Sequence, residues 1–298
     1  MRTAARLLPL LLLASFWAAG PAPAQGGAQA EILRRINAER QRAGAPPLRL
    51  DPALTRAAGA HAEAVASRGN VRLPAGSTGE MRLRLQRAGY EAHAWVESLA
   101  STSGDPESVI SNLRRGDPST WRKILDSEYR DLGVGVDRMG RASVYSILVA
   151  VPEADYFARG TSGLRDLERV RAAILARVNA ERARAGVAPL RSNEKLDLAA
   201  QRHAQDMLAR GYFAHASPEG KTVRERARAA GYEWRMIGEN IAEGQFSVDE
   251  VMDTWMHSPG HRRNILDPGF KELGAGMAMG RSNGTYRVLW AQAFGTKR

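Results

Sequence analysis

Cysteine is absent from all 298 residues of this chain. The absence excludes a disulfide scaffold, thiolate metal ligands, a cysteine nucleophile and a lipid-modified N-terminal cysteine. Hydrophobic residues make up 44% of the chain and charged residues 25%, which is an ordinary globular composition and argues against extensive disorder. The length suits two domains of roughly 100–150 residues each.

Acidic residues are comparatively few. Lys and Arg number 43 against 32 Asp and Glu, giving a formal net charge of +11 that suits an anionic partner such as an envelope polymer. The arginine run at residues 224–228 alternates with other residues and includes an acid, so we interpret it as a solvated helix face. It lacks the interleaved aromatic residues of nucleic-acid grooves, and we expect no nucleic-acid partner.

Beyond residue 24 no apolar run approaches the ~20 residues of a membrane span. Before that point, Arg2 and Arg6 precede an apolar run over residues 7–19, and Ala22-Pro23-Ala24 matches a signal-peptidase site. This pattern predicts a signal peptide over residues 1–24 and a secreted or periplasmic mature chain without a transmembrane segment. The alternative is a signal anchor that stays attached, for which the apolar run is short.

An internal repeat organises the rest of the chain. At an offset of 142, residues 36–40 align with 178–182, His61 with His203, and residues 89–91 with 231–233. After one residue is dropped, residues 124–126 align with 265–267. The repeat predicts two whole domains, at 30–155 and 165–298, joined by a linker at 156–164 that contains Gly-Thr-Ser-Gly.

Each copy begins with helices and ends with strands. In the second copy, apolar spacing predicts helices over residues 169–186, 194–210, 223–230 and 248–257, with Asn193, Thr222 and Ser247 as N-caps. Pro259 is expected to end the last helix. Two strands follow from Glu272 onward, joined by a turn at residues 282–284. The order indicates an α+β domain.

Four ordered motifs of the second copy point to a known family. They are F-A-H-A-S-P-E-G at 213–220, G-E-N at 238–240, W-M-H-S-P-G-H-R-R-N-I-L at 255–266 and Q-A-F-G at 292–295. Together they resemble the CAP superfamily of cysteine-rich secretory, antigen 5 and pathogenesis-related 1 proteins, in its bacterial SCP-like branch. The resemblance implies tandem α-β-α sandwich domains, each with a central antiparallel sheet, the first domain being a diverged copy.

The resemblance also implies a polar cleft with two histidines and two glutamates, at which some members bind divalent metal. By position, His215 matches the first histidine and Glu239 the glutamate of G-E-N. Leu289 and Ser258 stand where the family has its second histidine and second glutamate. His261 is the substitute ligand in the bacterial pattern. The resulting ligand-binding and metal-binding set is His215, Glu239 and His261.

Two imidazoles and a carboxylate suit Zn²⁺ or another divalent cation and leave one position for water. A bound water with a pKa lowered toward ~7 would serve a hydrolase, with Glu239 as candidate base. Without metal, the same groups would form a hydrogen-bonded cluster whose histidines titrate between about pH 5 and 8. His257 is a weaker ligand candidate, because Pro259 interrupts the helix face it would share with His261.

The first copy serves as an internal control because it keeps the carboxylate and lacks both cleft histidines. The paired positions are Glu97 for Glu239, Leu73 for His215, Thr120 for His261 and Val151 for Gln292. Structural and functional roles for Glu239 therefore stay equally open, whereas the two histidines favour a role specific to the second domain. We expect a packing or surface role for His203 and a place in the core or cleft wall for Trp255 and Trp290. We expect no nucleophile at Ser217, which lacks a G-x-S-x-G elbow.

The leading hypothesis is an exported binding module whose second domain binds a divalent metal, a small molecule or a lipidic ligand. The family resemblance alone supports the lipidic option. The rival hypothesis is a metal-dependent hydrolase, peptidase-like or acting on cell-wall material. Two of the four family cleft residues are missing and no nucleophile–base pair is visible, which favours binding. The sequence leaves enzymatic activity open.

Overall fold

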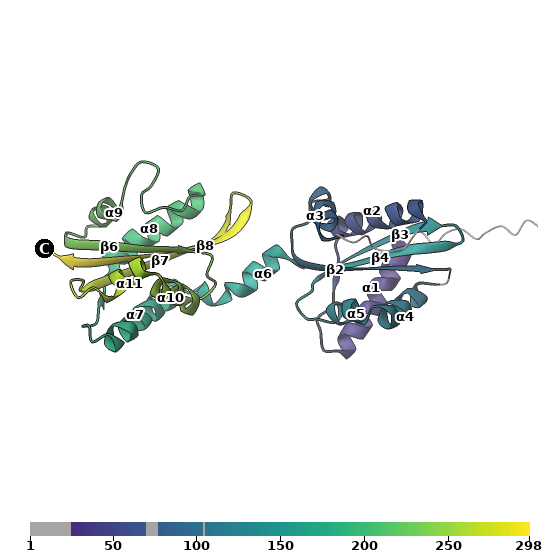
Figure 1. The fold of residues 1–298 in the computed structure, drawn as a ribbon, viewed down its shortest axis with the longest axis horizontal. Coiled ribbons are helices and arrows are strands. Elements are labelled where there is room, and N and C mark those ends of the chain that lie inside the picture. The colour runs from purple at the N-terminus through teal and green to yellow at the C-terminus, as the bar shows by residue number, and fades with distance from the viewer. Residues whose placement is uncertain (1–24, 70–76, 104) are drawn as a thin grey trace, which may run out of the picture. The chain divides into compact units, whose positions relative to one another are not determined.

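The computed structural model describes residues 25–69, 77–103 and 105–298, and its chain divides into two compact units between Pro152 and Glu153 (Figure 1). The predicted signal peptide over residues 1–24 and Leu73 lie outside the described residues. Among the helices of the described ranges, none combines the length and apolar character needed to cross a membrane.

The first unit alternates helices with the strands of one sheet. Its elements are α1 (Gln25–Arg42), β1 (Arg49–Leu50), α2 (Pro52–Arg68), α3 (Ser77–Ala88), β2 (Ala92–Thr102), α4 (Pro106–Gly116), α5 (Pro118–Ile124), β3 (Asp131–Met139) and β4 (Ala142–Pro152). The strand order is β1-β3-β4-β2.

The second unit repeats this order after a short helical entry. Its elements are α6 (Glu153–Gly160), the 3₁₀ turn η1 (Ser162–Leu164), α7 (Leu167–Arg184), β5 (Arg191–Ser192), α8 (Glu194–Arg210), α9 (Val223–Ala229), β6 (Trp234–Glu243), α10 (Val248–His257), α11 (Pro259–Leu266), β7 (Glu272–Ser282) and β8 (Thr285–Lys297). The strand order β5-β7-β8-β6 places β6 at an edge.

Both sheets lie between two layers of helices, which confirms the predicted α+β sandwich. In the second unit, α8 and α9 cover one face and α7, α10 and α11 the other (Figure 1). The long strands pair antiparallel, while the two-residue strands β1 and β5 pair parallel to β3 and β7. Each sheet is therefore mixed rather than wholly antiparallel.

The helix boundaries follow from capping side chains. Asn193, Thr222 and Ser247 accept hydrogen bonds from backbone N–H groups at the starts of α8, α9 and α10, as predicted. Pro259 does follow the end of α10, but it also opens α11, which the sequence prediction missed. Proline is well suited to this position because the first helical turn has no use for its missing N–H.

A buried arginine ties α1 in the first unit, and α7 in the second, to the loop before β3 or β7. Arg182 is fully buried and donates to the backbone oxygens of Ala188, Ile265, Asp267 and Phe270 at 2.7–3.4 Å. Arg40 makes the equivalent bonds in the first unit. Because the Arg182 side chain is buried, these carbonyls give its guanidinium the hydrogen-bond partners that water cannot supply. Trp255 and Trp290 are fully buried core residues, as expected.

The segment expected to be a linker, 156–164, is helical and packs on the second unit. Phe157 of α6 stacks on Tyr286 at a ring-centroid distance of 4.8 Å and meets Phe246 edge-on at 5.7 Å. Leu164 of η1 is buried in the same core. These contacts make α6 and η1 part of the second unit.

The last hairpin differs in length between the domains. Leu132 is paired with a residue 17 positions further along the chain, Val149. Its counterpart Leu273 is paired with a residue 21 positions further along, Phe294, so the second hairpin is four residues longer. Residues on β8 therefore align with β4 at a larger offset than the one that held before the hairpin.

Candidate functional site

The site lies along the edge strand β6. Glu239 on this strand turns its side chain toward the layer of α8 and α9, while its neighbour Asn240 turns toward α10 and α11, as successive strand residues must. His215 lies in the connection between α8 and α9, and His261 lies on α11. The two predicted histidines thus come from the helix layers on opposite faces of the sheet.

Glu239 pairs with two basic groups. Its Oε1 lies 2.9 Å from Nδ1 of His215, and its Oε2 accepts a hydrogen bond from Nη2 of Arg226. The side chains of Glu239 and Arg226 are only 5% and 11% exposed, whereas that of His215 is 59% exposed. An almost buried ion pair therefore holds one edge of an exposed imidazole.

The tautomer of His215 follows from this contact. An ionised carboxylate can only accept hydrogen bonds, so Nδ1 of His215 carries the proton that Glu239 binds. In the neutral ring the lone pair is then on Nε2. Arg226 also donates to the backbone oxygen of His215 at 3.1 Å, which fixes the loop as well as the carboxylate.

His203 approaches the same carboxylate from α8. Its Nε2 lies 3.9 Å from Oε1 of Glu239, and its side chain is fully buried. Burial lowers the pKa of His203 below its ordinary value, although the charge of Glu239 acts in the opposite direction. The imidazole is therefore neutral near pH 7.

Three amides hold α11 against β6 and thereby place His261. Asn264 donates to the backbone oxygen of Glu239 at 3.1 Å and to Oδ1 of Asn240 at 2.9 Å. Asn240 in turn donates to Gln292 and to the backbone oxygen of His261, at 3.1 and 3.2 Å. Asn240 and Gln292 are fully buried, so this network is shielded from water.

The ring of His261 has an unsatisfied buried nitrogen. Its Nδ1 is buried and finds no hydrogen-bond partner among the residues that the structure describes. Burial lowers the pKa of His261, and the nearby His215 lowers it further. The imidazole of His261 is thus neutral near pH 7, and it feels the charge of His215.

The first domain preserves the carboxylate cluster. Glu97 binds Arg84 through both oxygens at 2.8 and 3.0 Å, lies 2.8 Å from Nδ1 of His61, and accepts a 2.7 Å hydrogen bond from Ser146. Burial raises the pKa of Glu97, but His61 and Arg84 outweigh it and leave the pKa below its usual value. Glu97, Arg84 and His61 correspond to Glu239, Arg226 and His203 at the offset of 142. The two domains therefore share this trio, and His215 is an addition of the second domain.

Strand register corrects one of the matches made by sequence. Asn240 pairs with Gln292 across the sheet, and its counterpart Ser98 pairs with Ile147. Ile147, rather than Val151, is therefore the counterpart of Gln292, because the longer hairpin shifts the alignment. The first domain has no amide network of this kind at Ser98 and Ile147.

Arg226 and His203 are the two site residues that the sequence analysis missed. Arg226 lies in the run interpreted as a solvated helix face, and that interpretation is wrong for this residue. Its flanking residues Arg224 and Arg228 lie over the ring of Trp234, at 5.7 and 5.1 Å. The signal for Arg226 and His203 was their exact repetition in the first copy, alongside Glu97.

Two further candidates turn away from the site. Nδ1 of His257 contacts the backbone oxygen of Asp253 at 2.7 Å on the exposed end of α10. Ser217 donates to Glu219 at 3.0 Å and accepts from the backbone of Lys221 at 3.2 Å, which stabilises a turn. Neither geometry brings a ligand donor or a nucleophile to Glu239.

In the described ranges, no group of three or more His, Asp and Glu side chains is arranged to hold a metal ion. The hydrogen bonds explain why at this site. Both oxygens of Glu239 already have basic partners, and the cation of Arg226 occupies one of them. The arrangement therefore does not fit direct ligation of a divalent cation by Glu239.

The comparison with known proteins agrees with this architecture. The sequence pattern of the cysteine-rich secretory protein (CAP) family matches residues 33–150 and 175–294, more than half of the chain. The chain belongs to this family, with one match in each unit.

Two curated relatives come from Bacillus subtilis (strain 168). The uncharacterized protein YkwD is 39% identical over 116 residues, which are 39% of this chain and 43% of the relative. The uncharacterized membrane protein YlbC is 29% identical over 104 residues, which are 35% of this chain and 30% of the relative. The matched region thus spans less than half the length of either relative.

Solved structures are more distant in sequence. An extracellular protein from Bacillus anthracis that contains an SCP domain is 22% identical, with a TM-score of 0.39 and 52% of each chain covered. An outer surface protein from Borrelia burgdorferi is 16% identical, with a TM-score of 0.40, and the match covers 45% of this chain and 96% of that protein.

Proposed function

We propose that this chain is an exported binding protein whose second domain holds a small ligand between His215 and His261. The observation that carries the proposal is the 2.9 Å contact between Nδ1 of His215 and the buried carboxylate of Glu239. The contact leaves Nε2 of an exposed ring as a hydrogen-bond acceptor of fixed orientation. The partly exposed ring of His261 adds a second imidazole to the site.

This geometry supports a ligand that carries a hydroxyl or amine donor. Nε2 of His215 accepts one hydrogen bond from such a group, and a neutral His261 exchanges a second. The domain comparison supports the same view, because the first domain keeps the structural carboxylate without either histidine. A lipidic ligand rests on the family resemblance, since the two imidazoles recognise a polar head rather than a chain.

A divalent cation is the second candidate, and its fit is poorer. Because Glu239 is bound to Arg226, this carboxylate would not ligate the cation but would orient His215 from outside the coordination shell, as carboxylates often do for metal-binding histidines. His215 and His261 then supply two protein ligands, one fewer than catalytic zinc sites use. We therefore place ligand binding without metal first.

The hydrolase alternative has less support. It requires Glu239 as a base, and this carboxylate is bound on both oxygens. Ser217 is bound within its own turn and offers no nucleophile. Export is supported by the pattern of residues 1–24, and attraction to an anionic envelope polymer by the net charge of +11.

NMR of protein that carries ¹⁵N-labelled histidine tests the proposal. We expect the ¹⁵N shifts of His215 to report a proton on Nδ1, and a panel of small amino alcohols and amino sugars to shift His215 and His261. The His215→Ala variant should lose the response, while His257→Ala, which removes an exposed histidine of the same domain, should keep it. A proton on Nε2 of His215 would overturn the proposal, as would a panel without effect at millimolar concentration.

A Zn²⁺ titration of the same variants separates the two candidates. Tight binding that both His215→Ala and His261→Ala weaken about tenfold or more would favour the cation. Equal weak binding in all variants would favour the metal-free site.

A further inference from the structure

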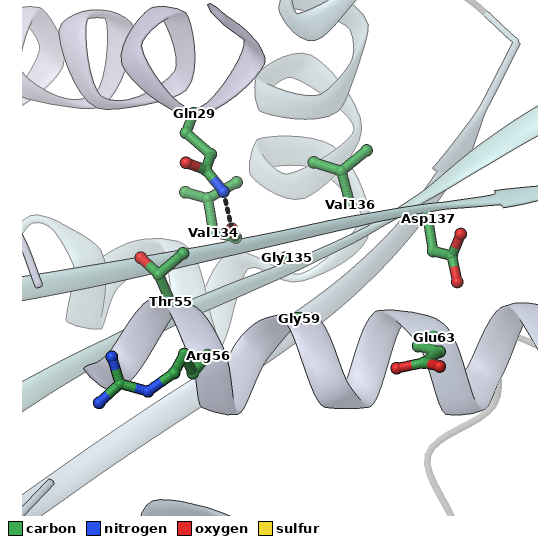
Figure 2. Close-up of a pocket in the computed structure, with 9 residues that line it drawn as sticks. All are labelled: Gln29, Thr55, Arg56, Gly59, Glu63, Val134, Gly135, Val136 and Asp137. Atoms are coloured by element: carbon green, nitrogen blue, oxygen red, sulfur yellow. Dashed lines mark hydrogen bonds between the residues drawn. The ribbon is translucent and has the colours of Figure 1, made fainter. Parts of the chain in front are cut away.

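Side chains of the adjoining helices satisfy backbone carbonyls at the edges of both sheets. In the second domain, Nε1 of Trp255 on α10 donates to the backbone oxygen of Ile241 on the edge strand β6 at 3.2 Å. Figure 2 shows a similar bond in the first domain, where Gln29 of α1 donates to the oxygen of Val134 on β3 at 3.0 Å. Such bonds matter because a carbonyl that is shielded from water needs another partner.

The edge strand β2 of the first domain lacks the bond that Trp255 makes. Ser98 pairs with β4 as Asn240 pairs with β8, so the next residue, Leu99, corresponds to Ile241. The oxygen of Ile241 points away from β8 to meet Trp255, and the oxygen of Leu99 therefore points away from β4. Among the residues that the structure describes, no side chain donates to this oxygen.

The donor is missing because the helix beside β2 has lost its tryptophan. Asp105 and Ser247 cap α4 and α10 at the offset of 142, and the same offset matches Leu113 with Trp255. Both of these side chains are buried in their domains. Leucine is much smaller than tryptophan and has no hydrogen-bond donor in its side chain. The first domain therefore lacks both the bulk and the N–H of the indole.

A cavity of about 360 Å³ lies where this indole is missing. It is lined by residues 98–101 of β2 and, on α4, by Leu113 and Gly116. The side chain of Leu99 lies on the same face of the sheet as that of Glu97, which binds Arg84 of α3, so the backbone of Leu99 borders the cavity. The volume is near the lower end of about 300–1,000 Å³ for small-molecule sites.

We propose that this cavity binds a small planar aromatic molecule with one ring N–H, of which indole is the simplest. The ring packs on Leu113 in the place that the side chain of Trp255 fills in the second domain. Its N–H donates to the backbone oxygen of Leu99, as Trp255 does to Ile241. An aromatic ring with a single donor suits a site that offers apolar contact and one free carbonyl. The site lies in the first domain and is independent of His215 and its ligand.

The test titrates the purified full chain with indole by isothermal calorimetry. Leu113→Trp fills the cavity with the side chain of the second domain and should weaken indole binding about tenfold or more. Leu113→Met is the matched control, because methionine has nearly the volume of leucine and leaves the cavity open. It should bind indole within about twofold of the parent chain.

A second ligand tests the hydrogen bond without any change to the protein. Benzofuran has the shape of indole with an oxygen in place of the N–H, so it should bind the parent chain about tenfold more weakly. Equal binding of the two ligands would overturn the proposal, and so would equal binding of indole by Leu113→Trp and Leu113→Met. A parent chain that binds no indole at millimolar concentration would contradict it as well.

Discussion

Replacing Glu239 by glutamine keeps the size of the side chain and removes its charge. The perturbation leaves Arg226, whose side chain is 11% exposed, without its counter-ion. It also changes the partner of Nδ1 on His215 from a carboxylate to an amide. Because the strand, the loop and α9 meet at this one carboxylate, the effect on the free energy of unfolding should be large.

The magnitude follows from burial. Removing one partner of a buried ion pair typically costs about 3–5 kcal/mol, because the other charge stays buried. Glutamine still offers Arg226 a carbonyl oxygen, so we expect the low end, about 3 kcal/mol. That loss corresponds to about a hundredfold change in the unfolding equilibrium of the second domain. The exposed His215 contributes little, as surface pairs do.

Hydrogen exchange in urea measures the free energy of unfolding of each of the two units separately, in one and the same chain. Glu239→Gln should lower protection in the second unit alone. Glu97→Gln should lower it in the first unit by at least as much, because Glu97 also accepts from Ser146. A loss below about 1 kcal/mol in the second unit, or a loss spread over both units, would refute the structural role assigned to the pair.

Two other predictions concern the same domain. Burial lowers the pKa of His203 and His261 below the ordinary 6.5, so the unfolded state binds protons at a higher pH than the folded state does. The free energy of unfolding of the second unit should therefore be highest above pH 6.5 and decrease as the pH drops below it. Thermal unfolding between about pH 8 and 5 measures this. A unit that becomes more stable on acidification would contradict this. Asn264→Ala removes two hydrogen bonds from α11 and should lower the free energy of unfolding by about 2 kcal/mol, with faster amide exchange in that helix. The control is Lys123→Ala, at the equivalent, exposed position of the first domain, which should lower it by less than about 0.5 kcal/mol.

Local signals accounted for most of the helices and for the hairpin. Asn193, Thr222 and Ser247 cap their helices as expected because a short polar side chain satisfies an orphan N–H wherever the apolar periodicity begins. Pro259 misled the prediction, since proline that cannot continue one helix can open the next. Boundaries of this kind depend on what the following residues do, which no single residue reveals.

Tertiary partners were harder to foresee. From the sequence, Arg182 would be expected to be an exposed charged residue of its helix. In the structure it is fully buried among carbonyls that belong to distant segments. Arg226 misled in the same way. Sequence alone predicted from family resemblance that His215 and Glu239 would be site residues, but the competition of Arg226 for the carboxylate needs coordinates. The sequence signal for both arginines was that each is repeated at the equivalent position of the first copy, as Arg40 and Arg84.

The longer hairpin of the second domain has a mechanical consequence. At its tip, Asn283 donates to the backbone oxygen of Gly211, the residue that ends α8 and starts the segment leading to His215. Arg287, near the start of β8, is anchored by Glu243 and reaches the oxygen of Tyr212. The added ribbon braces the root of the histidine-bearing loop. Insertions or deletions at this tip would therefore displace the loop that carries His215, even with His215, Glu239 and Arg226 themselves unchanged.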